Sequence, residues 1–165
     1  MITQTGAWIL LLPALPISIW AASSDLKRMK IPNLSVLALA AVWPVLGWLA
    51  VPTWGAWFWG FALMAIVLVI GFLLYSTGTF GAGDAKFAAA MAPMFVGTSI
   101  ARFLLILLVC MVGSLILHRI ARSIPAIRLM TPDWLSWEQR RYFPLGLALV
   151  MMLLVYLLSA ALLQA

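Results

Sequence analysis

Residues 55–75 read GAWFWGFALMAIVLVIGFLLY, a stretch without a single charged side chain. A helix needs about 20 mostly apolar residues to cross the hydrocarbon core of a bilayer, and this stretch is long enough. The whole chain has the same character, because 66% of its 165 residues are hydrophobic and 8% are charged. Soluble domains carry roughly 25% charged residues. The sequence therefore predicts an all-α, polytopic integral membrane protein.

Polar breaks and turn residues divide the chain on either side of this stretch into six apolar runs. The runs are 6–22, 34–50, 55–75, 85–97, 102–117 and 143–163. The connections are short except for 118–142, so we expect one transmembrane domain covering residues 1–165, with about six spanning helices. The only cysteine, Cys110, excludes a disulfide framework and a paired-cysteine metal site. We expect no metal and no cofactor.

The lysines and arginines predict the orientation. All ten except Arg102 fall in the first, third and fifth connections, at Lys27, Arg28, Lys30, Lys86, Arg119, Arg122, Arg128, Arg140 and Arg141. Cytoplasmic loops are enriched in these residues, so we expect the N-terminus outside and these connections on the cytoplasmic side of an inner (plasma) membrane. Topology and attraction to the lipid bilayer account for the net charge of +6. No basic helix face suggests a nucleic-acid partner.

Tryptophans are predicted to lie at the membrane surfaces. The sequence predicts an outer aromatic belt formed by Trp43, Trp48, Trp54, Trp57 and Trp59. Thr131-Pro132-Asp133 has the composition of a helix start, with a capping threonine, a proline and an acid in the first turn. We therefore expect a short interfacial helix carrying Trp134 and Trp137.

The chain has four acidic residues, and two of them are candidates for chemistry. Asp133 and Glu138 lie among arginines in the longest polar connection and are expected on the surface. Asp25 directly follows the first run, and Asp84 opens the fourth. A helix from Asp84 to Gly97 is about 21 Å long, and the hydrocarbon core is about 30 Å thick. Either the helix continues toward Ile100 or Asp84 lies below the membrane surface, where acids usually mark function.

Asp25 and Asp84 belong to the same predicted side of the membrane. Two carboxylates that lie close together tend to share one proton, because both cannot ionise easily. One then acts as a base on water while the other donates a proton to the substrate. This chemistry requires no metal, serine or cysteine. The only histidine, His118, is expected to be a polar interfacial residue, and Cys110 a packing residue.

The residues around both aspartates resemble motifs of the prepilin peptidase family. Gly81-Ala82-Gly83-Asp84 is similar to the Gly-x-Gly-Asp motif of membrane aspartyl proteases, followed by Lys86 as in prepilin peptidases. Asp25, with Lys27-Arg28 and Ile31-Pro32-Asn33 after it, resembles the first-aspartate motif. Phe143-Pro144-Leu145-Gly146 resembles the element that opens the last helix, with Leu145 where an aromatic residue is common.

This resemblance implies Asp25 and Asp84 as the catalytic pair of an aspartic endopeptidase. Its substrate would be a prepilin or pseudopilin, cleaved at the cytoplasmic face before the hydrophobic helix of the mature protein. The chain most resembles the small stand-alone enzymes of Flp/Tad-type pilus systems. Those enzymes lack the extra domain with which larger relatives N-methylate the new terminus. The oligomeric state is left open.

The resemblance also implies supporting roles for residues near the pair. Gly81 and Gly83, with Gly78, would permit an irregular backbone that approaches the substrate closely. Lys86 would either tune the pair electrostatically or extend to the interface. Pro32 and Asn33 would set the turn that positions Asp25, and Pro144 and Gly146 are assigned to packing. The alternatives are a proton-coupled membrane carrier that uses the same aspartates and a non-catalytic pilus assembly factor.

Overall fold

The computed structural model describes residues 1–78, 80–138 and 143–163, and every regular element in them is helical. Arg140 and Arg141, assigned above to the cytoplasmic side, lie outside the described residues. The elements, in chain order, are α1 (Gln4–Arg28), α2 (Asn33–Ala50), α3 (Trp54–Ser76), α4 (Ala82–Met91), the 3-10 helix η1 (Ala92–Phe95), α5 (Ile100–Ser123), α6 (Pro125–Met130), the 3-10 helix η2 (Leu135–Trp137) and α7 (Leu145–Leu163).

Five of the helices, α1, α2, α3, α5 and α7, are long and apolar enough to cross a membrane. This confirms the prediction of an all-helical, polytopic membrane protein. The fourth apolar run differs, because α4 ends at Met91 and continues only as η1, which contains Pro93. Together α4 and η1 extend about 23 Å, at 1.5 Å per residue in α4 and 2.0 Å in η1, which is less than the hydrocarbon thickness of about 30 Å. The structure therefore has five helices of spanning length and one shorter helix where we expected six spans.

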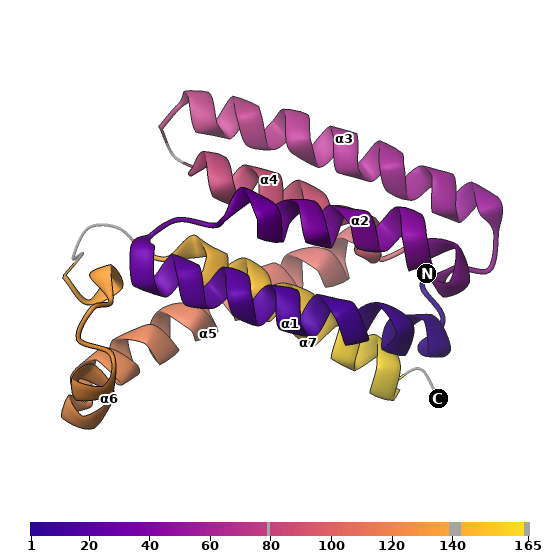
Figure 1. Ribbon diagram of the computed structural model, residues 1–165. Coiled ribbons are helices and arrows are strands. Elements are labelled where there is room, and N and C mark those ends of the chain that lie inside the picture. The colour runs from indigo at the N-terminus through magenta and orange to yellow at the C-terminus, as the bar shows by residue number, and fades with distance from the viewer. Residues whose placement is uncertain (79, 139–142, 164–165) are drawn as a thin grey trace.

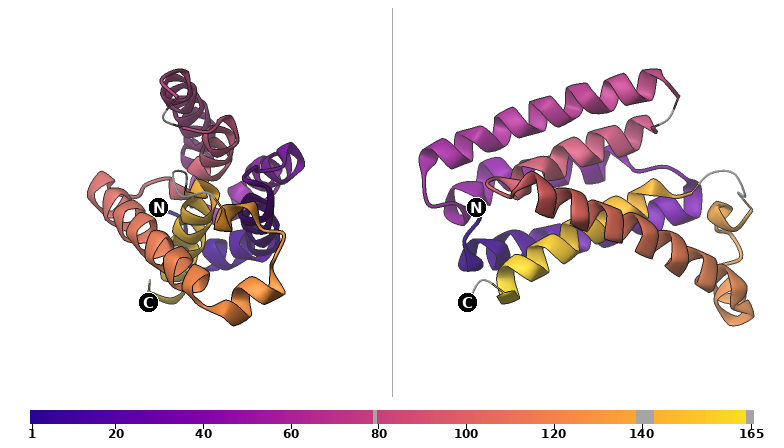
Figure 2. Two further views of the ribbon diagram at one scale, coloured as in Figure 1. Left: turned by 90° about the vertical axis from the view of Figure 1, so that its left-hand side faces the viewer. Right: turned by 180° about the vertical axis from the view of Figure 1, so that it is seen from behind.

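The core is built around α1, which packs along α7 and α2 (Figures 1 and 2). Ala7, Ala14 and Ala21, spaced at seven residues along α1, are fully buried. Small residues at such positions allow helices to approach closely. Outside this core, α3 packs mainly on α4, and α5 packs on α7.

Trp43 belongs to the core and not to the predicted aromatic belt. Its side chain is fully buried, and its indole nitrogen donates to the Trp57 carbonyl at 3.0 Å. The Trp57 indole donates back to the Trp43 carbonyl at 3.3 Å, which ties α2 to α3. Trp48, Trp54 and Trp59 are exposed, as a belt requires.

The prediction of a helix that begins at Thr131 is wrong, because the next helical element is η2, which begins at Leu135. Thr131 follows the end of α6, and its carbonyl accepts a hydrogen bond from the Trp137 indole at 3.0 Å. Trp137 is buried and stacks on His118, with ring centroids 5.1 Å apart. His118 is also buried in the protein, and its interfacial position in the membrane stays a prediction. Trp137 and His118 are buried because this connection folds back against α1 and α5.

The ends of the helices divide the basic residues between the two ends of the bundle. Helices α1, α3 and α5 end, and α2, α4 and α7 begin, at the left side of Figure 1, opposite the two chain termini. We call this the basic end. In the described part of the chain it carries Lys27, Arg28, Lys30, Lys86, Arg119, Arg122 and Arg128. Arg102 lies near the start of α5, toward the opposite end.

Candidate active site

Asp25 lies in the last turn of α1 and is held by the first turn of α7. Its side chain is only 5% exposed, and its Oδ2 accepts a hydrogen bond from the Gly146 backbone N–H at 2.9 Å. The backbone N–H of Leu147 also interacts with this carboxylate. The first N–H groups of a helix lack intrahelical acceptors and favour a negative charge. Asp25 therefore joins the end of α1 to the start of α7.

Gly146 leaves the space that the Asp25 carboxylate occupies. A Cβ atom at this position would lie 2.7 Å from Asp25 Oδ2 and 2.9 Å from Ile31 Cδ1. Any side chain would force one of these neighbours to move. Gly146, expected above to serve in packing, also donates a direct hydrogen bond to Asp25 through its backbone N–H.

Asp84 lies in the first turn of α4, and Gly81 is the residue that precedes this helix. The Asp84 carboxylate accepts a hydrogen bond from the Gly81 backbone. This is one half of a capping box, in which an acid in the first turn reaches back to the residue before the helix. A Cβ atom at Gly81 would lie 2.5 Å from Asp84 Oδ2, so glycine permits the close approach.

Ile31 lies between the segments that carry the two aspartates. Its side chain is 9% exposed, and it faces Gly146 on one side. On the other side, a Cβ atom at Gly83 would lie 3.4 Å from Ile31 Cβ, so the start of α4 packs against the same side chain. The structure therefore brings the end of α1, the start of α4 and the start of α7 together around Ile31.

The two carboxyl groups interact electrostatically. Asp84 lies outside the five helices of spanning length, and burial raises the pKa of its carboxyl group above the ordinary value. The negative charge of Asp25 raises this pKa further, while the hydrogen bond from Gly81 opposes both effects. Two such groups favour a state with one proton between them.

Lys86, Asn33 and Pro32 lie at the margin of this arrangement. The Lys86 ammonium group donates to Asn33 Oδ1 at 3.4 Å, a long hydrogen bond between α4 and α2. Pro32 occupies the position before α2, and its carbonyl accepts a bond from the Ser35 hydroxyl at 2.8 Å. The Lys86–Asn33 bond therefore links the start of α2 to α4, whereas the Pro32–Ser35 bond is local to the start of α2.

The irregular backbone expected at the glycines is limited to Gly78. Gly78 has a φ of +72°, whereas Gly81 has a φ of −75° and Gly83 belongs to α4. Thr79 lies outside the described residues. Gly81 and Gly83 therefore matter here through their missing side chains and not through an unusual backbone conformation.

Two residues that contact the site, Ile31 and Gly146, were not among the predicted site residues. Both belong to motifs quoted above: Ile31 to Ile31-Pro32-Asn33 and Gly146 to Phe143-Pro144-Leu145-Gly146. The motifs were the available signal, but nothing local in the sequence indicates that these two residues meet.

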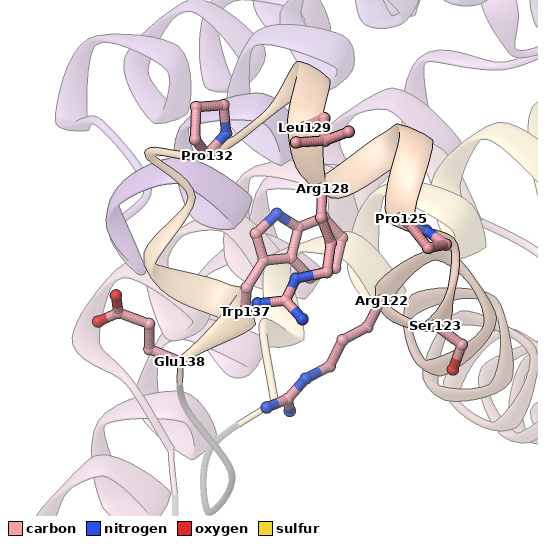
Figure 3. Close-up of a pocket in the computed structure, with 8 residues that line it drawn as sticks. All are labelled: Arg122, Ser123, Pro125, Arg128, Leu129, Pro132, Trp137 and Glu138. Carbon is pink, nitrogen blue, oxygen red and sulfur yellow. The ribbon is translucent and has the colours of Figure 1, made fainter.

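A cavity of about 450 Å³ at the basic end is separate from the aspartates. Figure 3 shows Arg122 and Arg128 extending from two different helices toward the region of Trp137. Its lining includes Glu138 but neither Asp25 nor Asp84. This cavity therefore has a cationic and aromatic lining and is not the location of the carboxyl pair.

Residues 12–118 match the model of the type IV leader peptidase family. The chain belongs to this family. The matched segment includes Asp25, Ile31 and Asp84, while Gly146 lies beyond it. Membership supports a leader-peptidase type of function, prepilin-type substrates and a multi-pass membrane setting. No curated protein and no solved structure shows a significant match to the chain.

Proposed function

We propose that this leader peptidase is a membrane-embedded aspartic endopeptidase, with Asp25 and Asp84 as its catalytic pair. It cleaves the leader from prepilin or pseudopilin substrates of the Flp/Tad type. The observation that supports this proposal is the convergence of α1, α4 and α7 around Ile31, with the charge of Asp25 acting on Asp84.

The reaction follows from a pair of carboxyl groups that holds one proton. The ionised carboxylate removes a proton from a water molecule, whose oxygen attacks the carbonyl carbon of the cleaved peptide bond. The protonated carboxyl group donates its proton to the carbonyl oxygen. When the tetrahedral intermediate collapses, the C–N bond breaks and the leaving nitrogen takes up a proton. The products are a carboxylate and an amine, and no acyl-enzyme forms.

Two backbone N–H groups orient the pair in this proposal. The Gly146 N–H fixes Asp25 Oδ2, and the backbone of Gly81, the residue before α4, fixes Asp84. Hydrogen bonds of this kind favour the ionised form of a carboxyl group and oppose the effect of burial. They therefore help to keep one of the two groups ionised while the other holds the shared proton.

We further propose that the basic end faces the cytoplasm and that the N-terminus lies outside. The support is the concentration of lysine and arginine at that end, since cytoplasmic loops are enriched in these residues. The reaction then takes place at the cytoplasmic face of the inner membrane. Fusion of a reporter to each loop, with activity measured in intact cells, tests this orientation.

The test of the proposed activity is co-expression with a candidate Flp-type prepilin, whose size is measured on a gel. Asp25→Asn and Asp84→Asn are compared with the unaltered protein at matched levels in the membrane. Asp133→Asn and Glu138→Gln are matched controls, because both acids are exposed. We expect shortening by the unaltered protein and by both controls, and none by the two variants of the pair.

Two results would contradict the proposal in different ways. Shortening by Asp25→Asn or Asp84→Asn would show that the catalytic pair is assigned wrongly. If the unaltered protein shortens no prepilin, the carrier and the assembly factor become the better explanations.

A further inference from the structure

An apolar groove with a volume of about 680 Å³ lies between α3 and α5. One wall is a face of α3 that includes Leu63, Val67 and Ile70, and the other is a face of α5 that includes Phe103 and Leu107. Along its lining, α3 contributes residues from Trp59 to Leu74, a length of about 22 Å. The groove therefore follows most of the thickness of a hydrocarbon core.

The groove is open along its side because the two helices that form its walls pack on different neighbours and not on each other. Helix α3 packs on α4, and α5 packs on α7, with no extensive contact between α3 and α5 in the described residues. The end-on view in Figure 2 shows these two helices diverging from the centre of the bundle. Only 11% of the central stretch of each is buried, against 56% for α7. A partner can therefore enter from the side, within the membrane.

The floor of the groove leads to the candidate active site. On α4 the floor residues Ala88 and Met91 follow Asp84 at spacings of four and seven, so they share its helix face, and Phe95 of η1 extends the floor beyond them. The lining also includes Phe80, directly before Gly81, and Leu145, directly before Gly146. The groove therefore ends at the two segments that hold the aspartates.

The lining has the chemistry that an apolar helix requires. None of its residues is charged, and small side chains at Ala88, Ala92 and Ala148 lie between long side chains on the walls. Small residues allow a second helix to approach closely in a membrane. A lipid acyl chain has no bond that must be placed beside Asp84, so the alignment of the floor with Asp84 does not favour its binding. A substrate that is cleaved at one end of its helix does require this alignment.

We propose that the groove between α3 and α5 is the docking site for the apolar helix of the substrate, with Ala88 and Ala148 on the floor. This rests on the proposed function, because it takes as substrate a protein that is cut directly before an apolar helix. One face of that helix lies along the groove, and its first residue lies beside Asp84. The depth at which the helix is seated determines which peptide bond reaches the pair.

Filling the groove tests this docking site by activity. Ala88→Phe adds a large side chain to the floor, and Ala65→Phe adds the same side chain to an exposed position of α3 that does not line the groove. Because the added ring would occupy the space in which the substrate helix is seated, we expect Ala88→Phe to slow prepilin cleavage roughly fivefold or more, mainly through a higher KM. Ala65→Phe is expected to cleave at the unaltered rate. Equal rates for Ala88→Phe and the unaltered protein would overturn the docking site.

Cross-linking provides a second test that does not depend on how well Ala88→Phe folds. Val67 lines the groove, whereas Val69 is an exposed valine on another face of the same helix. Each is changed to cysteine in a Cys110→Ala background and cross-linked to a prepilin with one cysteine in its apolar helix. We expect an adduct with Val67→Cys and little or none with Val69→Cys. Equal adducts, or adducts only with Val69→Cys, would overturn the proposal, as would the absence of both.

The two proposals fail in distinguishable ways. If the unaltered protein cleaves prepilin but the groove variants behave like their controls, the docking site alone is wrong and lipid is the better occupant. If no prepilin is shortened by the unaltered protein, the proposed function is wrong.

Discussion

The two candidate catalytic aspartates are held in different ways. Asp25 lies on a long helix in the most buried part of the bundle, and its carboxylate is fixed by the N-terminus of a different helix, α7. Asp84 lies at the start of the short helix α4, and its carboxylate is fixed by Gly81, three residues away. One position thus depends on tertiary packing and the other mainly on local structure. Substitutions near Asp25 should therefore have larger effects than substitutions near Asp84.

The largest effect is expected from Gly146→Ala. The added methyl group would overlap Asp25 Oδ2 and Ile31 Cδ1, and α7 is too buried to move easily. A displacement of about 1 Å in a catalytic group costs on the order of 100-fold in rate, and we expect at least this loss in prepilin cleavage. The control is Gly113→Ala on α5, where the nearest atom to the new methyl group is 3.9 Å away. Equal activity of the two variants would contradict the role given to Gly146.

A smaller effect is expected at the glycines beside Asp84. Substitution of Gly81 should slow cleavage more than substitution of Gly83. A methyl group at Gly81 would lie 2.5 Å from Asp84 Oδ2, whereas one at Gly83 would lie 3.4 Å from Ile31 Cβ. Asp84 is only partly buried and can reach its catalytic position in an off-rotamer geometry that costs about 0.5–1.5 kcal/mol, so Gly81→Ala should slow cleavage about twofold to tenfold. Gly83→Ala should remain close to the unaltered rate. Steady-state cleavage of a prepilin measures both, and a larger loss for Gly83→Ala would contradict this explanation.

The pH dependence of cleavage should reflect the raised pKa of Asp84. Burial and the charge of Asp25 make this carboxyl group retain its proton to a higher pH than an exposed aspartate does. If the active pair holds one proton, activity falls as the pH rises through this pKa, and also in acid when both groups are protonated. We expect the fall on the alkaline side to begin well above the pKa range of exposed aspartates. An alkaline fall within that ordinary range would show that Asp84 is not perturbed as described.

The smallest effect is expected at Lys86 and Asn33. Their hydrogen bond is long, at 3.4 Å, and it joins two helices beside the pair without contacting either aspartate. Exposed polar pairs typically contribute at most about 1 kcal/mol. Lys86→Met and Asn33→Ala should therefore each change the cleavage rate by less than about fivefold. A loss comparable with that of Gly146→Ala would give Lys86 the electrostatic role that the sequence left open.

The sequence was sufficient to predict the helical class and the spans that became α1, α2, α3, α5 and α7, because long apolar runs require them. It was not sufficient for α4, since an alanine-rich run has the same composition whether it crosses the membrane or ends early at Pro93. Trp43 and Trp137 were expected at membrane surfaces, but both side chains are buried, Trp43 against α3 and Trp137 against His118 of α5. A tryptophan gives no local signal that distinguishes these two positions.

The candidate site was predicted as far as its motifs allowed. The two aspartates could be named because few acids occur in the chain and each follows a recognisable pattern. The roles of Ile31 and Gly146 could not be derived, because they arise from contacts between separate segments, such as Asp25 and Gly146, which are 121 positions apart. Such contacts depend on how α1 packs against α7, which no local pattern reports.

The most direct test of the central proposal is the single-turnover rate of prepilin cleavage by the purified protein in lipid. Asp25→Asn, Asp84→Asn and the double variant are compared with the unaltered protein. Residues that act as one catalytic unit are strongly non-additive, so the three variants should fall to the same residual rate. Losses in the single variants that multiply in the double variant would show that the two carboxyl groups act independently, which would contradict a shared catalytic pair.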